Sequence, residues 1–250
     1  MSIEKAFDNL SEEILQPWNI VNKIENFPEV VIVTFNEDII NIVEKRSDAE
    51  IIGEFNAGYK IPIYKITHKN KKIAIYKTLI GAAGTVGLLE ESIAKGGKKF
   101  VVFGSCGTLD KDISVGNFII PTAAYRDEGT SYHYMPASDY IEVKTSGKLS
   151  EIMTELKLPH IKGKTWTTDA IYRETRNNML KRKSEGCLTV EMECAAVMAA
   201  GQFRDIEVYQ YLYAEDNLDS DEWERRSMGS VPLSAKERYL LIALDIAVMV

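Results

Sequence analysis

Residues 100–107 read Phe-Val-Val-Phe-Gly-Ser-Cys-Gly, and this stretch says most about the fold. Its first half is the most apolar strand candidate in the chain, which is typical of a buried strand. Its second half follows without a break, and glycines there allow the backbone to approach a ligand closely. Ser105 adds a hydroxyl and an amide at the same turn. The stretch predicts a central strand that ends in a turn able to face a ligand.

Strand and helix candidates alternate on both sides of this stretch. Apolar runs predict strands at residues 30–34, 61–67, 73–79, 118–120, 162–168 and 207–213. Amphipathic or charged runs predict helices at residues 88–94, 146–156, 173–183, 190–203 and 233–250. The glycine-rich residues 81–87 are expected to form a turn. The alternation implies crossover connections, so we expect an α/β fold: a single domain with a mixed central β-sheet flanked by helices.

Composition excludes several classes of protein. The chain has 250 residues, 45% apolar residues and a net charge of −7, enough to bury a core and unlike most nucleic-acid-binding proteins. Three cysteines without a CxxC pair and three histidines argue against a disulfide scaffold and a Cys/His metal site. No signal-peptide core and no run of about 18 apolar residues is found. We therefore expect a cytoplasmic protein with no membrane partner, formed by an N-terminal extension at residues 1–29 and a domain at 30–250.

Two acidic segments could carry chemistry. Glu191, Met192 and Glu193 interrupt an otherwise apolar run, and a buried carboxylate is costly without a partner. A carboxylate beside a thioether suits a sugar, whose diol would bind the acid while its apolar face rests on sulfur. The alternative is a helix N-terminus that acids make favourable. Asp216 follows the strand at 207–213, where a carboxyl group could act as a general acid or simply begin a charged loop or lid.

Three segments together resemble the nucleoside phosphorylase family, in order and in spacing. They are VVFGSCGTLDKDISVGNFIIPTAAYRDEGTSYHY at 101–134, GKTWTTDAIYRET at 163–175 and VEMECAAV at 190–197. The family includes uridine phosphorylase, the hexameric bacterial purine nucleoside phosphorylases and the hydrolytic methylthioadenosine nucleosidases. The resemblance covers roughly residues 30–250. It implies the family's α/β fold and cleavage of the N-glycosidic bond of a nucleoside.

The resemblance also implies roles for individual residues. Met192 and Glu193 would hold the ribose, with Glu193 binding the 2′- and 3′-hydroxyls. Ser105 would lie between the phosphate and the ribose, and Asp216 would assist the departing base as in the purine-cleaving members. Further candidates for the base side are Thr168, Asp169 and Tyr172. No cofactor or metal is implied beyond inorganic phosphate as a co-substrate, and the family habit predicts a homo-oligomer, at least a dimer.

The acceptor side departs from the family pattern. Phosphorolytic members hold phosphate with a GDPxR loop after the first strand, whereas residues 34–39 here read Thr-Phe-Asn-Glu-Asp-Ile. Family arginines are also missing two residues before the GSCG turn, where Val102 stands, and before the turn of the strand pair. Arginines give phosphate bidentate, charge-assisted contacts that are not easily replaced. The candidates for the acceptor side are Ser105, Glu37, Asp38, Lys60 and Arg126.

Three interpretations stay open at this point. Because most members of the family use phosphate, the resemblance favours phosphorolysis to the free base and (deoxy)ribose 1-phosphate. The missing arginines favour hydrolysis, with Glu37 or Asp38 activating water. Lys60, Lys65 and Arg126 could instead form a different phosphate cradle. The third interpretation is a nucleoside-binding or regulatory protein without turnover. Asp216 favours a purine as the base, while the segments at 126–131 and 165–170 look more like the uridine branch.

Overall fold

A mixed ten-stranded sheet organises the described part of the chain, residues 3–250 of the computed structural model. Its strands are β1 (Val30–Thr34), β2 (Glu50–Asn56), β3 (Lys60–His68), β4 (Lys71–Lys77), β5 (Lys99–Thr108), β6 (Phe118–Asp127), β7 (Tyr140–Glu142), β8 (His160–Thr168), β9 (Cys187–Glu191) and β10 (Glu207–Asn217). The order across the sheet is β10-β6-β8-β9-β5-β1-β4-β3-β2, and β10 also pairs with β5. The strands β5, β10, β6, β8 and β9 therefore close into a ring.

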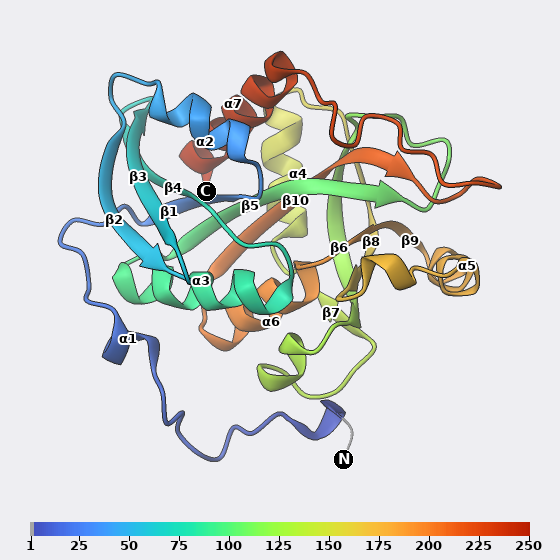
Figure 1. Cartoon of the computed structure of the whole chain (residues 1–250), viewed down its shortest axis with the longest axis horizontal. Helices are drawn as coiled ribbons and strands as arrows, with labels where there is room; N and C mark the ends of the chain where they lie inside the picture. The colour runs from blue at the N-terminus through green and yellow to red at the C-terminus, as the bar shows by residue number, and fades with distance from the viewer. Residues whose placement is uncertain (1–2) are drawn as a thin grey trace.

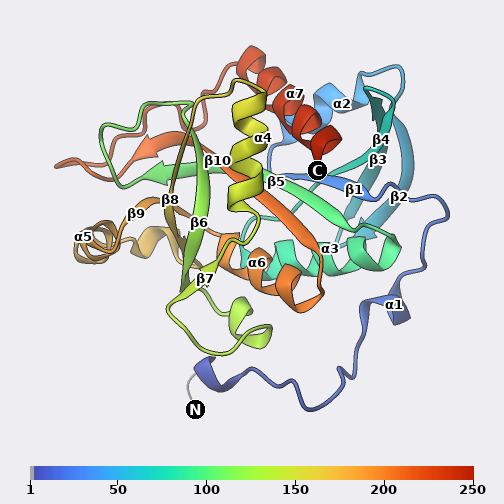
Figure 2. The same ribbon diagram turned by 180° about the vertical axis from the view of Figure 1, so that it is seen from behind.

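Helices cover both faces of this sheet (Figures 1 and 2). One face carries α2 (Glu37–Glu44), α4 (Ser146–Glu155) and α7 (Leu233–Met249), which bury apolar side chains against β1, β5 and β10. The other face carries α3 (Ala82–Lys95) and α6 (Cys194–Phe203). The short α1 (Pro17–Ile20) and the 3-10 turn η1 (Ile3–Lys5) run outside this second layer; η2 (Thr130–His133), η3 (Ile171–Arg173) and α5 (Arg176–Ser184) follow the strands of the ring.

The expected fold class is confirmed, and residues 100–103 lie in the central strand as predicted. The predicted turn at 104–107 is wrong, because β5 continues through these residues to Thr108. β5 pairs in parallel with β1 and β10, so it has neighbours on both sides. Phe100 to Phe103 are all buried, as the apolar run predicted. Among residues 3–250, no helix is long and apolar enough to cross a membrane. The division into an extension at 1–29 and a domain at 30–250 stays a prediction.

Two other local predictions are wrong. Residues 82–87 form the first turns of α3 rather than a glycine-rich turn, and only Gly81, at φ +95°, lies outside the helix. A side chain at Gly84 would come within 2.8 Å of Leu79, so glycine serves close packing there. Residues 190 and 191 belong to β9, not to the predicted helix, because this short strand pairs with β8 and β5. The helix α6 begins only at Cys194.

Candidate active site

The candidate site lies where β4, β1, β5 and β10 reach their carboxyl ends. Thr34 pairs in register with Lys77 of β4 and with Phe103 of β5. Two residues further along β5, Ser105 pairs with Tyr213 of β10. Because parallel strands end at one edge of the sheet, the last residues of β5, the start of α2 and the end of β10 are brought together.

Glu193 is held at the sugar side by a helix N-terminus. Its carboxylate is buried and accepts a hydrogen bond from the backbone N–H of Gly81 at 2.6 Å, directly before α3. Burial raises the pKa of Glu193 to about 8, and the charge of Glu191 adds to this effect. Besides its backbone contacts, the carboxylate has further acceptor capacity for hydroxyl groups.

Glu191 lies only two residues before Glu193, but its hydrogen bonds are structural. Its carboxylate accepts the backbone N–H groups of Glu193 at 2.8 Å and Cys194 at 2.7 Å, and the Thr167 hydroxyl at 2.6 Å. It therefore caps the start of α6 and joins β9 to β8. Burial raises the pKa of Glu191 to about 7, while these hydrogen bonds oppose the shift. Met192 stands between the two glutamates and is half-buried.

Replacing the capping glutamate should destabilise the fold. In Glu191→Ala, two backbone N–H groups and one hydroxyl lose their acceptor, and each buried group left unpaired costs about 1–3 kcal/mol. We expect the Tm in a thermal melt to fall by roughly 5–10 °C. Glu222→Ala, at an exposed position of the loop after β10, is the matched control and should leave the Tm unchanged. Equal melting of both variants and the parent protein would refute the capping role.

Asp216 sits at the end of β10, where the register with β5 shifts by one residue. One carboxylate oxygen accepts the indole N–H of Trp223 at 2.8 Å. The other oxygen lies over the backbone of Gly107, where an added Cβ would approach it to 3.2 Å. Burial raises the pKa of Asp216, and the Trp223 hydrogen bond opposes this. No local pattern in the sequence points to Trp223, because it approaches Asp216 only where the loop after β10 folds back.

Removing the indole donor should change the titration of Asp216. Trp223→Phe keeps an aromatic ring but loses the N–H group that favours the carboxylate, so the pKa of Asp216 should rise further. A ¹³C NMR titration of the Asp216 carboxyl group measures this directly. Trp18→Phe, which removes an indole bonded to Gln16 instead, should have no effect. An unchanged pKa in Trp223→Phe would mean that the contact is not maintained in solution.

The base-side candidates are spread over the segment after β8. Thr168 is buried, and its hydroxyl accepts the backbone N–H of Ala170 at 3.1 Å. Asp169 accepts the backbone N–H of Gly129 at 3.0 Å, which joins this segment to the end of β6. Tyr172 is 96% exposed and contacts no other part of the site. Thr168 and Asp169 therefore shape the loop, while Tyr172 points to solvent.

The sequence analysis did not single out Glu174, a half-buried carboxyl group between η3 and α5. Burial raises the pKa of Glu174 to about 7, and the charge of Asp216 adds to the shift. Its only visible signal in the sequence is a single acid among arginines and threonines. Nothing in that pattern shows that the acid will lie near Asp216, 42 residues away in the numbering.

Of the residues that stand where the family has its phosphate loop and arginine, one makes the acceptor side partly apolar. Val102 and Ile39 are fully buried in the cores on opposite faces of the sheet, so neither reaches a ligand. Phe35 alone lies at the edge, where its ring covers Gly104 so closely that an added Cβ would stand 2.8 Å away. Ser105 is exposed beside it.

The acids predicted to activate water each have a lysine partner. Glu37 pairs with Lys77 at the end of β4. Asp38 pairs with Lys236 of α7, and this contact lowers the pKa of Asp38. The sequence analysis did not identify either lysine, because each comes from a distant strand or helix.

The three cations predicted as a phosphate cradle all have partners within the chain, and Lys65 pairs with Glu50 at 2.6 Å. Lys60 is exposed at the start of β3 and pairs with Glu54 at 2.8 Å. Arg126 is buried and packs on the Tyr132 ring at 3.9 Å. Its guanidinium donates to Ser131 at 2.8 Å and to the carbonyl of Pro136 at 2.6 Å, among other contacts in residues 131–138. These contacts tie Arg126 to this loop, and its contact with phosphate stays a prediction.

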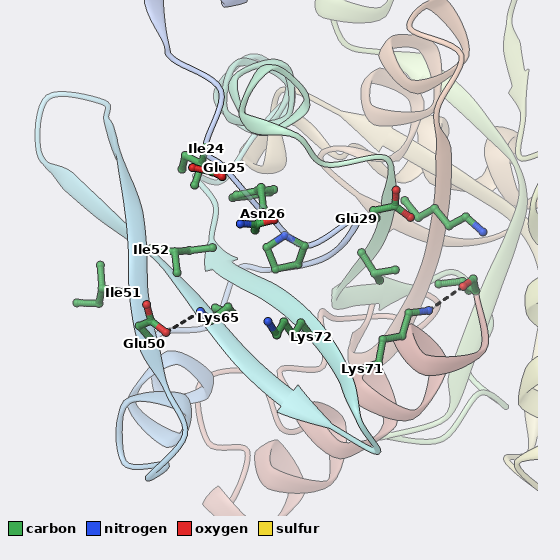
Figure 3. A pocket seen from close by; sticks show the side chains of 15 residues that line it. Ile24, Glu25, Asn26, Glu29, Glu50, Ile51, Ile52, Lys65, Lys71 and Lys72 are labelled. Carbon is green, nitrogen blue, oxygen red and sulfur yellow. Dashed lines mark hydrogen bonds and ion pairs between the residues drawn. The ribbon is translucent and has the colours of Figure 1, made fainter.

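A large cavity lies at the opposite edge of the sheet (Figure 3). Its volume is about 880 Å³, and it opens beside the amino ends of β1 and β5. Three of its lysines have partners: Lys65 pairs with Glu50 at 2.6 Å, Lys71 donates to the carbonyl of Val250 at 3.0 Å, and Lys99 pairs with Glu207 at 3.3 Å. Lys65 is the one candidate from the sequence analysis that lines it, whereas Glu193, Ser105 and Asp216 do not.

Comparison with known proteins supports the resemblance seen in the sequence. The model of the Phosphorylase superfamily matches residues 29–239. Guanosine phosphorylase of Halorubrum lacusprofundi is 26% identical over 181 residues, which cover 71% of this chain and 73% of that protein. Purine nucleoside phosphorylase of Plasmodium vivax is 27% identical over 183 residues, which cover 71% of this chain and 74% of that protein.

Two solved structures share the fold. Purine nucleoside phosphorylase of Toxoplasma gondii, in complex with immucillin-H, has a TM-score of 0.76 at 21% identity and covers 89% of this chain and 91% of its own. AMP nucleosidase of Bacteroides thetaiotaomicron has a TM-score of 0.71 at 18% identity and covers 90% of this chain and 89% of its own. One neighbour is thus named a phosphorylase and the other a nucleosidase, so the shared fold alone does not select an acceptor.

Proposed function

The chain belongs to the phosphorylase superfamily, and from this premise we propose that it cleaves the N-glycosidic bond of a purine nucleoside. The observation that carries the proposal is the buried carboxylate of Glu193, held by the Gly81 N–H at 2.6 Å. A buried carboxylate with spare acceptor capacity suits a pair of sugar hydroxyls. The names of the relatives, a guanosine and a purine nucleoside phosphorylase, support a purine as the base.

Charge development explains why these residues suit this reaction. As the C1′–N bond breaks, positive charge builds on the sugar and negative charge builds on the base, and groups that meet these charges lower the barrier. Two hydroxyl donors favour the charged form of Glu193, so binding of a ribose diol should release the proton that burial retains. Asp216, whose pKa burial raises, would protonate a ring nitrogen of the departing base. Ser105 and Met192 would line the part of the site that holds the sugar.

Two acceptors compete for the other face of the sugar. The names of the relatives favour phosphate, which makes phosphorolysis to ribose 1-phosphate the first candidate. A specific observation favours water as the second candidate. Lys77 and Lys236 are paired with Glu37 and Asp38, and the Phe35 ring covers Gly104. A phosphate dianion would lose hydration there without a free cation among these groups.

The second candidate, with water as the acceptor, predicts that cleavage depends little on phosphate. The measurement is the initial rate of base release with phosphate removed and with phosphate added up to the millimolar range, with the sugar product identified by chromatography. Free ribose without phosphate indicates hydrolysis, and Glu37→Gln or Asp38→Asn should then slow the reaction, one much more than the other. Saturable dependence on phosphate, with ribose 1-phosphate as the product, would contradict this expectation and show that the lysines exchange partners when phosphate binds.

A further inference from the structure

We propose that Trp223 is the surface on which the base of the nucleoside stacks, and that the same indole group holds Asp216 beside that base. This inference rests on the proposed function and deepens it, because a large aromatic face favours a two-ring purine over a one-ring pyrimidine. Trp223 is then a substrate contact and also a positioning residue for Asp216. Nothing in the sequence pattern or in the names of the relatives assigns a role to this residue.

Trp223 differs from the other two tryptophans of the chain in how its ring is packed. Trp166 is 1% exposed in a core cluster, and its N–H donates to Asp127 at 3.0 Å. Trp18 has the guanidinium of Arg204 over its ring at 5.4 Å. Trp223 is 56% exposed, and in the described part of the chain its ring has no aromatic or cation–π partner. Much of its apolar surface is therefore free to contact a flat ligand.

The one polar contact of this indole lies at the candidate acid. Its N–H donates to Oδ2 of Asp216 at 2.8 Å. Because an indole N–H lies in the plane of the ring, the carboxyl group of Asp216 stands at the rim of that ring. A base that stacks on the ring therefore lies beside the carboxyl group. Oδ2 receives the indole N–H, so Oδ1 is the oxygen that carries the proton to the base.

The loop that carries Trp223 closes on itself, which keeps the ring in place. The backbones of Asn217 and Glu224 exchange two hydrogen bonds, both at 3.0 Å. The side-chain amide of Asn217 also donates to Ser220 at 2.7 Å and to Glu224 at 3.1 Å. Trp223 is thus the neighbour of a paired residue. A ring that is already held loses little freedom when a ligand stacks on it, which favours binding.

Two other parts of the chain hold the same loop. The guanidinium of Arg226 donates to the carbonyl of Ile113 at 2.7 Å. Arg176, at the start of α5, donates to the carbonyl of Ser220 at 2.6 Å, and α5 lies beside the loop in both views (Figures 1 and 2). Since α5 follows the base-side candidates at 168–172, these contacts join the loop to the segment that the resemblance assigns to the base.

The first test follows the indole itself. Protein with Asp216→Asn, which is expected to consume little substrate, is titrated with inosine while tryptophan fluorescence is recorded. Stacking should quench the fluorescence in a saturable way, and uridine should need an at least about tenfold higher concentration for the same quench. Adding Trp18→Phe should leave the quench in place. Adding Trp223→Phe should abolish it, because the two indoles that remain do not contact the base.

The second test separates the ring from its N–H group. Trp223→Phe keeps an aromatic face without the donor, whereas Trp223→Gln keeps an N–H donor of similar reach without the ring. The measurements are KM and kcat for inosine and for 7-methylguanosine, whose positively charged base departs without a proton. Trp223→Gln should raise KM for both substrates by about tenfold or more. Trp223→Phe should keep both KM values within about threefold and lower kcat for inosine alone, since only inosine needs the proton of Asp216.

Two results would overturn the inference. One is a KM in Trp223→Gln that equals that of the unaltered protein for both substrates, and the other is tryptophan fluorescence that inosine does not quench. Trp18→Phe is the control for the loss of an indole and should leave KM and kcat unchanged. Quenching by inosine without release of base from either substrate would support the stacking surface and contradict the proposed function instead.

Discussion

Glu193→Gln is expected to fold normally and to lose most of the activity. The amide keeps the size of the side chain but replaces an acceptor carboxylate that faces the sugar diol. Losing a charge-assisted contact of the transition state typically costs about 2–4 kcal/mol, a rate loss on the order of 10²-fold. The loss should appear in kcat/KM for base release from a purine nucleoside.

Comparison with Glu191 shows whether the activity lost in Glu193→Gln comes from the sugar contact or from damage to the fold. Glu191 and Glu193 are both buried, but only Glu191 caps α6, through the N–H groups of residues 193 and 194. Glu193→Gln should therefore melt like the unaltered protein, while Glu191→Ala should not. Turnover by Glu193→Gln at the rate of the unaltered protein would show that this carboxylate does not hold the sugar.

Asp216→Asn is expected to lose about 10²–10⁴-fold in the rate of base release, the usual contribution of general acid catalysis. The amide can accept the Trp223 N–H as the carboxylate does, at the same 2.8 Å position, so the loop should stay in place. What is lost is the group that carries a proton to the base. Initial rates with inosine or guanosine measure the loss.

A substrate whose leaving group needs no proton distinguishes general acid catalysis by Asp216 from a role of Asp216 in binding. A 4-nitrophenyl riboside has a leaving group that departs as an anion without protonation. Asp216→Asn should therefore cleave it nearly as fast as the unaltered protein, while Glu193→Gln should lose activity on both substrates because both carry the diol. An equal loss on both substrates in Asp216→Asn would mean that Asp216 does not act as the acid.

The sequence predicted the parts of the fold that depend on local pattern. The apolar run at 100–103 could only be stable as a buried strand, and the structure places it between β1 and β10. The glycine-rich pattern around Gly84 wrongly predicted a turn. Glycine is needed there within a helix, because Leu79 packs against it. The local pattern failed again at Val190 and Glu191, since a five-residue strand is held by pairing with residues far away in the chain. Neither contact is visible in local periodicity.

The sequence likewise indicated some residues of the candidate site and missed others. Glu191, Met192 and Glu193 stood out in the sequence because acids interrupt an apolar run, but only the hydrogen bonds show which acid is the cap. Trp223 could not be found, because it meets Asp216 through a loop that folds back onto the end of β10. Arg126 was selected for its charge, yet burial against residues 131–138 engages its donors.

The most direct test of the central claim is release of free base from a panel of nucleosides, followed by chromatography with and without phosphate. The chain is expected to release hypoxanthine or guanine from inosine or guanosine, with Glu193→Gln slower by about 10²-fold under the same conditions. Adenosine and uridine complete the panel and identify the preferred base. The absence of free base from every nucleoside, from protein that is folded by thermal melt, would contradict the account and indicate a protein that binds its ligand without cleaving it.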